Sequence, residues 1–195
     1  MRLIIARHGE THENVKKVFQ GLNNGTLSRN GRQQIKKLAN RLKDEQFDII
    51  LSSDLKRTIE TTKAILKYHK KVPVIYMKLL RERNIGILEG KKIDDHPEFY
   101  YKTSGPSARP PKGESFADVR KRAIKLWKTV SKKYHGKSVL VVTHTIFIRQ
   151  LLGYLLHKSV MGSFEISQGN TAVNIIEVDE DRRHRVHLIG CVKHL

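Results

Sequence analysis

The sequence predicts an α/β fold, a three-layer sandwich in which a mainly parallel sheet carries helices on both faces. Short apolar runs alternate with amphipathic segments over most of the 195 residues, and this alternation is typical of sheets built from successive strand–helix units. It is interrupted once, at about residues 77–113, where four of the five prolines lie. We therefore expect one domain over residues 1–195, with a lid-like insertion at about 77–113.

Three strands are expected in the first half of the chain, each a short apolar run. They lie at residues 3–6, 47–53 and 72–76. The third run contains Pro73, which has no amide hydrogen to donate, so we expect this strand near a sheet edge. Ser28 and Asp54 are expected to cap the helices that follow the first two strands, because each precedes a helical apolar period.

The second half of the chain continues the pattern. A helix at about residues 115–134 precedes the clearest buried strand, residues 138–143, which ends at His144. A further helix runs through Leu155. The tail alternates apolar and polar residues, and strands are expected there at residues 163–167, 172–178 and 185–191. These strands leave a free sheet edge, so a homodimer is one expected assembly.

The composition limits the class of protein. Hydrophobic residues make up 38% of the chain and charged residues 29%. No run approaches the ~18 apolar residues of a membrane span, and residues 1–7 are too short and too soon charged for a secretory signal. The single cysteine, Cys191, suits a reducing compartment. We therefore expect a cytoplasmic protein that does not associate with membranes.

The net charge of +19 is the unusual bulk property. Such a charge attracts anions, whether phosphorylated metabolites or nucleic acid. The lysines are scattered in pairs such as Lys16-Lys17 and Lys132-Lys133, and no zinc finger, RNA-recognition motif or basic strip interleaved with aromatics is present. A solvated basic surface is the favoured interpretation, and a non-catalytic anion or nucleic-acid binder stays an alternative.

Charged and polar residues follow three of the expected strands. In parallel sheets, ligands bind beyond the carboxyl ends of the strands. Arg7 and His8 leave the first strand, Arg57 follows the second after a short loop, and His144 leaves the strand at 138–143. Two histidines and two arginines are therefore expected to meet at one edge of the sheet.

These residue types suit phosphoryl transfer, whose catalysis rests mostly on positioning and electrostatic stabilisation. The planar fork of Arg57 can donate to two phosphoryl oxygens. A histidine among arginines resists protonation, so neutral His8 is a candidate nucleophile. His144 is expected to donate a hydrogen bond to the oxyanion from the facing side. The leaving alcohol needs a proton, for which Glu82 and Glu10 are candidate general acids.

The segment Arg7-His8-Gly9-Glu10-Thr11 resembles the signature of the histidine phosphatase superfamily, which includes the cofactor-dependent phosphoglycerate mutases. Further segments resemble the family's motifs in the same order: Asn14 with Phe19-Gln20-Gly21, Leu27-Ser28 with Gly31, Ser52 to Thr61, Leu80 to Gly86 with Glu89-Gly90, Gly113-Glu114-Ser115, and Thr143-His144. The similarity covers essentially the whole chain.

The resemblance implies a role for each matching residue. His8 is expected to become phosphorylated, Arg7, Arg57 and His144 to hold the phosphoryl group, and Glu82 to act as acid and base. The substrate side is expected to include Asn14, Gln20, Gly21, Arg81 and Thr145. Two positions depart from the family pattern, because Thr145 replaces a frequent glycine and Ile85 a frequent aromatic. No metal or other cofactor is implied.

Two segments invite a metal-site interpretation. His8 and His12 have the spacing of a helical zinc pair, but Gly9 and the end of a strand argue against a helix there. Asp94-Asp95-His96 has no partner cluster in the sequence. We expect no metal site.

Within the superfamily the choice lies between phosphatase and mutase. The mutases that this chain resembles are longer and carry a larger insertion after the loop that corresponds to Glu82. Here the segment that leads to Ser115 is short, and it resembles the phosphatase branch that contains alpha-ribazole phosphatases and broad phosphomonoesterases. We expect a phosphomonoester hydrolase that acts on a small phosphorylated metabolite. A 2,3-bisphosphoglycerate-dependent phosphoglycerate mutase is the alternative. Basic residues are expected to accommodate a second anionic group, namely Lys78, Lys91, Lys92, Lys102, Arg109 and Lys112.

Overall fold

The computed structural model describes residues 1–99, 105–181 and 183–195, so Lys102 lies outside the described residues. One sheet contains six strands in the order β3-β2-β4-β1-β5-β6. The strands are β1 (Arg2–Arg7), β2 (Ile49–Ser52), β3 (Val74–Tyr76), β4 (Ser138–Thr143), β5 (Val173–Val178) and β6 (His184–Cys191). Strands β1 to β4 run parallel to one another, and β5 and β6 are antiparallel additions.

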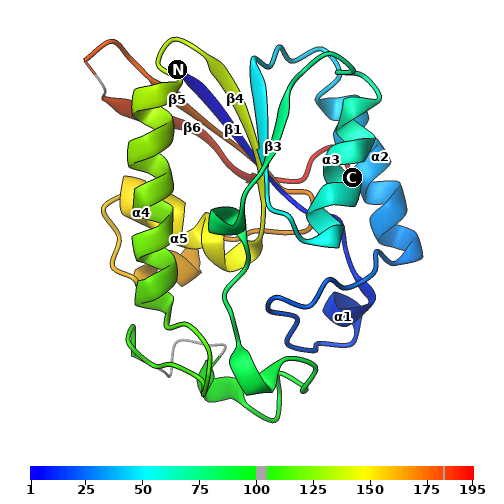
Figure 1. The fold of residues 1–195 in the computed structure, drawn as a ribbon, viewed down its shortest axis with the longest axis vertical. Coiled ribbons are helices and arrows are strands. Elements are labelled where there is room, and N and C mark those ends of the chain that lie inside the picture. Colours follow the sequence, from blue (N-terminus) through cyan, green and yellow to red (C-terminus); the bar gives the residue numbers. More distant parts are fainter. Residues whose placement is uncertain (100–104, 182) are drawn as a thin grey trace.

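Helices cover both faces of this sheet, which confirms the expected three-layer α/β fold (Figure 1). The α-helices are α1 (His12–Val15), α2 (Arg29–Arg41), α3 (Lys56–Leu66), α4 (Phe116–Lys133) and α5 (Thr145–Leu155). Short 3-10 turns are η1 (Lys78–Leu80), η2 (Gly86–Leu88), η3 (Pro97–Phe99) and η4 (Gly162–Glu165). Helices α2 and α3 lie on one face of the sheet, and α4 and α5 on the other.

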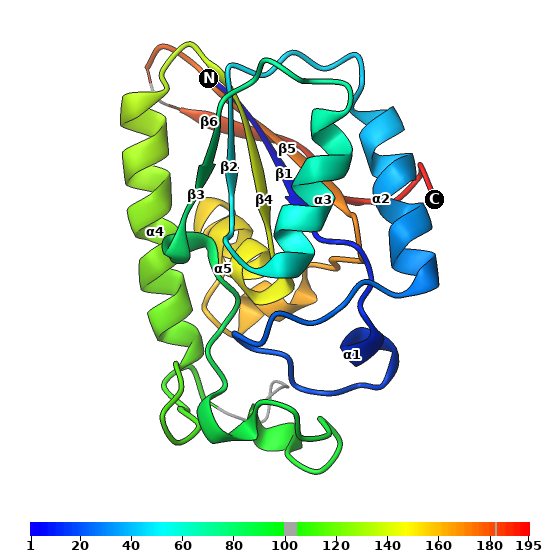
Figure 2. The same cartoon turned by 45° about the vertical axis from the view of Figure 1, so that its right-hand side comes forward.

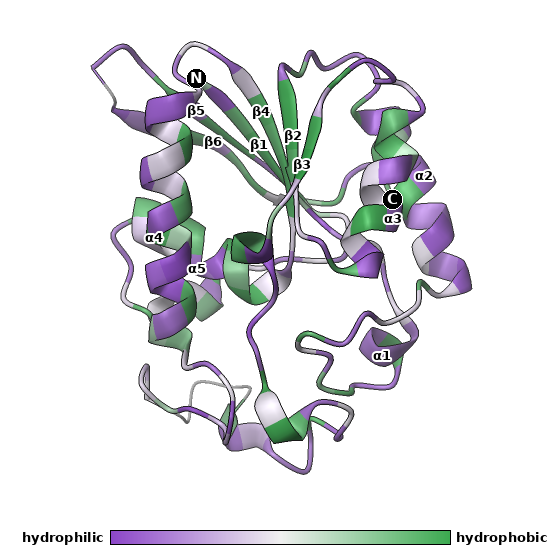
Figure 3. Ribbon diagram, viewed as in Figure 1, coloured by the Kyte–Doolittle hydropathy of each residue, from purple (hydrophilic) through white to green (hydrophobic). Residues whose placement is uncertain are grey.

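Each central strand contributes to both halves of the core because successive side chains point to opposite faces. In β1, Leu3 and Ile5 pack toward α4 and α5, whereas Ile4 and Ala6 pack toward α2 and α3. Figure 3 shows hydrophobic residues along the central strands and alternating hydrophobic and hydrophilic bands on α4. The two-sided burial explains why these strands read as continuous apolar runs.

Side-chain caps fix the starts of α2 and α4. Ser28 accepts a hydrogen bond from the Gly31 amide and caps α2 as expected. Ser115 and Asp118 form a reciprocal capping box at the start of α4. The expected cap at Asp54 is wrong, because Leu55 occupies the cap position of α3 and the Asp54 carboxylate is taken by Arg81.

The tail differs from expectation in one segment. The alternation predicts a strand at residues 163–167, but the structure places η4 there. The Ile166 amide bonds locally to the Ser163 carbonyl, and the Ser163 hydroxyl bonds to Val160 and Gln150, so the segment folds back on α5. The other two tail strands form as β5 and β6, and β3, which follows Pro73, lies at the opposite edge as expected.

The segment that follows β3, residues 77–99, extends past the carboxyl ends of the parallel strands. It lies at the same end of the sheet as α1 (Figures 1 and 2). It joins the loop after α1 through backbone hydrogen bonds. The Phe19 amide donates to Lys91, the Gly90 amide to Phe19, and the Ile93 amide to Lys17. These bonds hold the two irregular segments together across the site end of the sheet. Among the described residues, no helix is long and apolar enough to cross a membrane.

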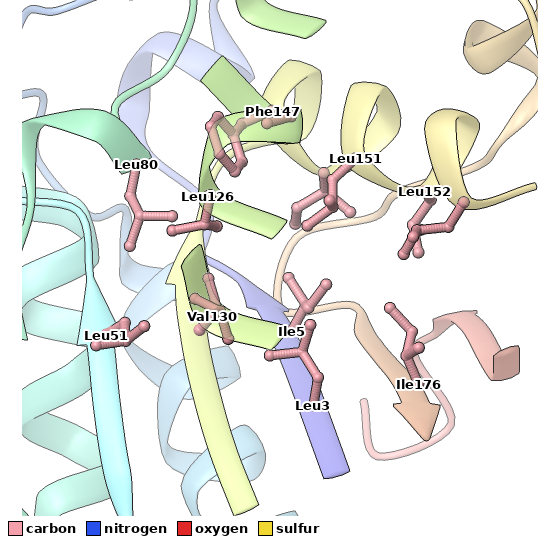
Figure 4. Packing of buried hydrophobic residues seen from close by; sticks show 14 of the residues in the cluster. Leu3, Ile5, Leu51, Leu80, Leu126, Val130, Phe147, Leu151, Leu152 and Ile176 are labelled. Carbon is pink, nitrogen blue, oxygen red and sulfur yellow. The ribbon is translucent and has the colours of Figure 1, made fainter. Parts of the chain in front are cut away.

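Close packing between α5 and the sheet is visible in Figure 4, where Leu151 and Leu152 face Ile5 and Ile176. All four side chains are fully buried. This contact anchors the helix whose first turn reaches the site, so it links core stability to site geometry.

Leu152→Ala is expected to lower the free energy of unfolding by about 2–5 kcal/mol, because it removes buried apolar surface and leaves a cavity. Urea denaturation followed by circular dichroism measures the change. Ile87→Ala is the control, since Ile87 is 55% exposed and its truncation is expected to cost less than about 0.5 kcal/mol. Similar losses in both variants would contradict this assignment of the core.

Candidate active site

His8 lies directly beyond the end of β1, beside the end of β4. Arg7 and Thr143 are register partners in the two strands, so the next residues, His8 and His144, emerge side by side. The His8 amide donates to the Thr143 carbonyl at 3.1 Å, and the Thr171 amide donates to the His8 carbonyl at 3.2 Å. The backbone of His8 is therefore held from both sides.

The His8 ring has a defined tautomer. Its Nδ1 lies 2.7 Å from the Gly9 carbonyl, and a carbonyl only accepts, so Nδ1 carries the hydrogen. Burial, followed by the charges of Arg57 and Arg7, holds the pKa of His8 well below its ordinary value. The ring is therefore neutral at pH 7, and Nε2 presents an unprotonated lone pair.

Arg57 enters the site from the first turn of α3 and is almost completely buried. Its Nη1 donates to the Asn23 carbonyl at 2.6 Å and its Nη2 to the Gly21 carbonyl at 2.9 Å. Burial lowers the pKa of Arg57 to about 10, so the guanidinium stays charged at neutral pH. The side chain thus fixes the loop after α1 and lines the cavity beside His8.

His144 lies beside His8, with the centres of the two rings 5.2 Å apart. Its Nδ1 accepts from Arg57 Nε at 3.2 Å, so the ring hydrogen lies on Nε2, which donates to Ser53 Oγ at 2.9 Å. Burial, and then the Arg57 charge, lowers its pKa well below the ordinary value. Both nitrogens are engaged and the ring does not line the cavity. In this arrangement His144 bonds and orients Arg57, and its expected hydrogen bond to an oxyanion stays a prediction.

The two candidate acids are separated by the structure. Glu82 lines the cavity. Its Oε1 accepts from the Arg83 amide at 2.9 Å, and its Oε2 accepts from the Ile146 amide of α5 at 3.3 Å. Glu10 instead accepts from Ser28 Oγ at 2.6 Å, at the start of α2, and lies outside the cavity lining. Of these two candidates, Glu82 is the one that lines the cavity beside His8.

A cavity of about 330 Å³ opens over His8, Arg7 and Arg57. Four of the five expected substrate-side residues line it, namely Asn14, Gln20, Gly21 and Thr145. Gly21 has φ +52°, and a Cβ there would lie 2.3 Å from Glu89 Oε1, so the turn requires glycine.

Arg81 does not line this cavity, which corrects the expectation that it contacts substrate. Its guanidinium forms two parallel bonds of 2.6 Å with the Asp54 carboxylate. This bidentate pairing uses the two parallel N–H donors of Arg81 that a ligand would need.

Several lining residues were missed by the sequence interpretation. Asn170 donates to the His8 carbonyl and to Asn14 Oδ1, at 3.3 and 3.2 Å. Arg83 is buried, donates to the Ala108 and Glu114 carbonyls, and has its guanidinium carbon 3.7 Å from the centre of the Phe116 ring. These contacts join residues far apart in the chain, and no local pattern marks them.

The described basic residues that were expected to hold a second anion do not line the cavity. Of those expected, the described ones are Lys78, Lys91, Lys92, Arg109 and Lys112, and none lines it. Lys17 and Arg83 are the additional cations among its lining residues.

The metal-site interpretations gain no support from geometry. His8 is buried at a strand end, whereas His12 is exposed on α1. Within residues 1–99, 105–181 and 183–195, no group of three or more His, Cys, Asp or Glu side chains is placed to hold a metal ion.

The two buried neutral histidines are expected to make the fold acid-sensitive. Unfolded imidazoles take up a proton as the pH falls through about 6.5, whereas the folded pKa values of His8 and His144 lie well below this. The unfolded state therefore binds more protons below that pH. The free energy of unfolding should fall by about 1.4 kcal/mol per pH unit for each histidine, down to its folded pKa.

Urea titrations at several pH values below neutrality measure this slope. His8→Asn is expected to reduce this slope by the contribution of one histidine. His12→Asn, at an exposed position, is expected to leave the slope unchanged. The same slope in wild type and His8→Asn would show that His8 is not held neutral by its surroundings.

The motifs and the geometry agree with comparisons to known proteins. A sequence model of the histidine phosphatase superfamily (branch 1) matches residues 3–190. A broad-specificity phosphatase of Saccharomyces cerevisiae is 32% identical over 207 residues, covering 100% of this chain and 87% of its own. Bacillus stearothermophilus YhfR superposes with a TM-score of 0.89 at 28% identity, covering 99% of this chain and 98% of that chain.

A mutant phosphoserine phosphatase from Entamoeba histolytica, solved in complex with phosphoserine, superposes with a TM-score of 0.87 at 26% identity. The match covers 100% of this chain and 98% of that chain. The expected resemblance is confirmed over the whole chain, which belongs to the histidine phosphatase superfamily.

Proposed function

We propose that this chain hydrolyses phosphomonoesters of small metabolites through a phosphohistidine formed on His8. One observation carries the proposal: a neutral imidazole, with Nδ1 tied to the Gly9 carbonyl, presents its free Nε2 beside two arginines at a cavity. The phosphatase names of relatives that span the whole chain support the same reaction class.

In the first step His8 Nε2 attacks phosphorus and the bond from phosphorus to the ester oxygen breaks. Arg7 and Arg57 line the cavity beside this nitrogen, and their charges stabilise the negative charge spread over the phosphoryl oxygens. The Glu82 carboxyl gives its proton to the departing oxygen, so the alcohol leaves neutral.

In the second step water attacks the phosphohistidine. Glu82, now a carboxylate, takes one proton from the water, the bond from nitrogen to phosphorus breaks, and hydrogen phosphate leaves. His8 is again neutral, and Glu82 has regained the proton that it gave up in the first step. His8 and Glu82 account for every proton transferred in the two steps.

The size of the cavity bears on the substrate. A volume of about 330 Å³ is at the small end of the range for ligand pockets. Its walls are partly apolar, with Phe19, Ile85 and Phe99 on the side formed by irregular segments. A small phosphorylated metabolite fits such a site better than a phosphorylated protein surface does.

His8→Ala is expected to abolish phosphatase turnover on small phosphomonoesters and the trapping of acid-labile phosphate on the protein, because no other neutral imidazole faces the cavity from the described residues. Phosphate release and quench-flow labelling measure the two effects. His12→Ala is the matched control, since it changes an exposed histidine in the next segment. Retained labelling in His8→Ala would reject the nucleophile assignment.

The product distinguishes hydrolase from mutase. With 3-phosphoglycerate, the proposed hydrolase releases inorganic phosphate whether or not 2,3-bisphosphoglycerate is present. Formation of 2-phosphoglycerate that depends on the bisphosphate and exceeds phosphate release would assign a mutase instead. Absent turnover on a substrate panel, together with tight and steeply salt-dependent binding to duplex DNA, would favour the non-catalytic alternative.

A further inference from the structure

We infer that Arg122 and Glu114 are a positioning pair that fixes Glu82 for proton transfer. The inference rests on the proposed function, in which Glu82 is the acid. Glu114 belongs to the segment Gly113-Glu114-Ser115, whose family resemblance is otherwise unexplained by the reaction. Neither residue lines the cavity, so the pair acts through Glu82 and touches no substrate.

Arg122 projects from α4 to the backbone on the amino-terminal side of the acid. Its Nη1 donates to the Leu79 carbonyl at 2.8 Å and to the Arg81 carbonyl at 3.1 Å. Its Nη2 donates to the carbonyl of Glu82 itself at 3.3 Å. One guanidinium thus ties the segment leading into the acid to a helix of the core.

Glu114 completes the pair on the other side. Its carboxylate accepts two bonds from Arg122, Nε to Oε1 at 2.8 Å and Nη2 to Oε2 at 2.9 Å. The same Oε2 accepts from the Asn84 amide at 2.9 Å, and the Glu114 amide donates to the Asn84 carbonyl at 2.8 Å. The backbone is therefore clamped at residue 84 as well as at residues 79–82.

This clamp has a direct consequence for the acid because residues 81–85 lie outside any helix or strand. Within the described residues, the hydrogen bonds to the Glu82 carboxylate come from two backbone amides, those of Arg83 and Ile146. A displacement of about 1 Å in a reacting group can cost ~100-fold in rate. The pair supplies the rigidity that regular secondary structure does not supply at this point.

The leaving group distinguishes positioning of an acid from general support of the fold. An alkoxide is strongly basic and needs the proton, whereas 4-nitrophenolate leaves well without one. The parameter kcat/KM reports the steps up to departure of the alcohol, before water attacks. Loss of acid positioning should therefore lower kcat/KM for an alkyl phosphomonoester far more than for 4-nitrophenyl phosphate.

The variants are Arg122→Lys and Glu114→Gln, assayed with phosphoserine and with 4-nitrophenyl phosphate. Each is expected to lower kcat/KM for phosphoserine by about 10- to 100-fold and for 4-nitrophenyl phosphate by less than about threefold. Glu82→Gln removes the acid itself, so it gives the largest expected loss of kcat/KM for phosphoserine relative to 4-nitrophenyl phosphate. In the double variant with Glu82→Gln, Arg122→Lys should add no further selectivity, because the two changes act on one proton transfer.

Arg120→Lys is the matched control. Arg120 lies on the same helix and also bonds backbone carbonyls, those of Lys158 and Ser159, together with Gln150 Oε1, and none of these contacts involves the Glu82 segment. It should lower kcat/KM for both substrates equally or not at all. Urea midpoints identify any variant that is unfolded at the assay temperature.

Equal losses on both substrates in Arg122→Lys and Glu114→Gln would overturn the inference and leave only a structural role. A selective loss in Arg120→Lys would overturn it too. If Glu82→Gln shows the selective loss but the pair does not, the pairing fails while the proposed reaction stands. If Glu82→Gln shows none, the acid assignment itself fails, and the positioning inference fails with it.

Discussion

The guanidinium of Arg57 is the interaction on which the rest of the site depends. It is buried, charged, and bonded to His144 on one side and to the Gly21 and Asn23 carbonyls on the other. A buried cation is stable only when its donors are satisfied, and the same bonds satisfy carbonyls that belong to no helix or strand. One side chain therefore sets the tautomer of His144, the path of the loop after α1, and part of the field that keeps His8 neutral.

Other arginines around the cavity also donate to backbone carbonyls of loops. Arg83 bonds the Ala108 and Glu114 carbonyls, and Arg122 bonds those of Leu79, Arg81 and Glu82. In each case the planar fork of arginine holds irregular backbone that lies beyond the sheet, where strand ladders no longer reach. The parallel strands place His8 and His144 side by side, and arginines then organise the loops that surround them. A lysine at these positions would offer one flexible charge and lose the fixed fork.

The sequence is sufficient to predict the sheet, most helices and the inner part of the site. Buried strands read as apolar runs, and the rule that ligands lie beyond strand ends is enough to group His8, Arg57 and His144. Prediction fails where a contact is decided by distant partners. Residues 163–167 alternate like a strand but bond locally and to α5, and Arg81 is taken by Asp54, which lies far from it in the chain. Arg83, Arg122 and Asn170 each donate to a backbone carbonyl far away in the chain, and such an acceptor carries no sequence signal.

The hydrogen bond from His8 Nδ1 to the Gly9 carbonyl also decides the chemistry of any covalent intermediate. In the proposed reaction only Nε2 is free to bond phosphorus, so the intermediate is the tele isomer of phosphohistidine and not the pros isomer. The two isomers differ in their nitrogen chemical shifts and in the lability of the bond to phosphorus. A single carbonyl of the neighbouring glycine thereby sets the regiochemistry of the enzyme, and with it the lifetime of the species that water must reach.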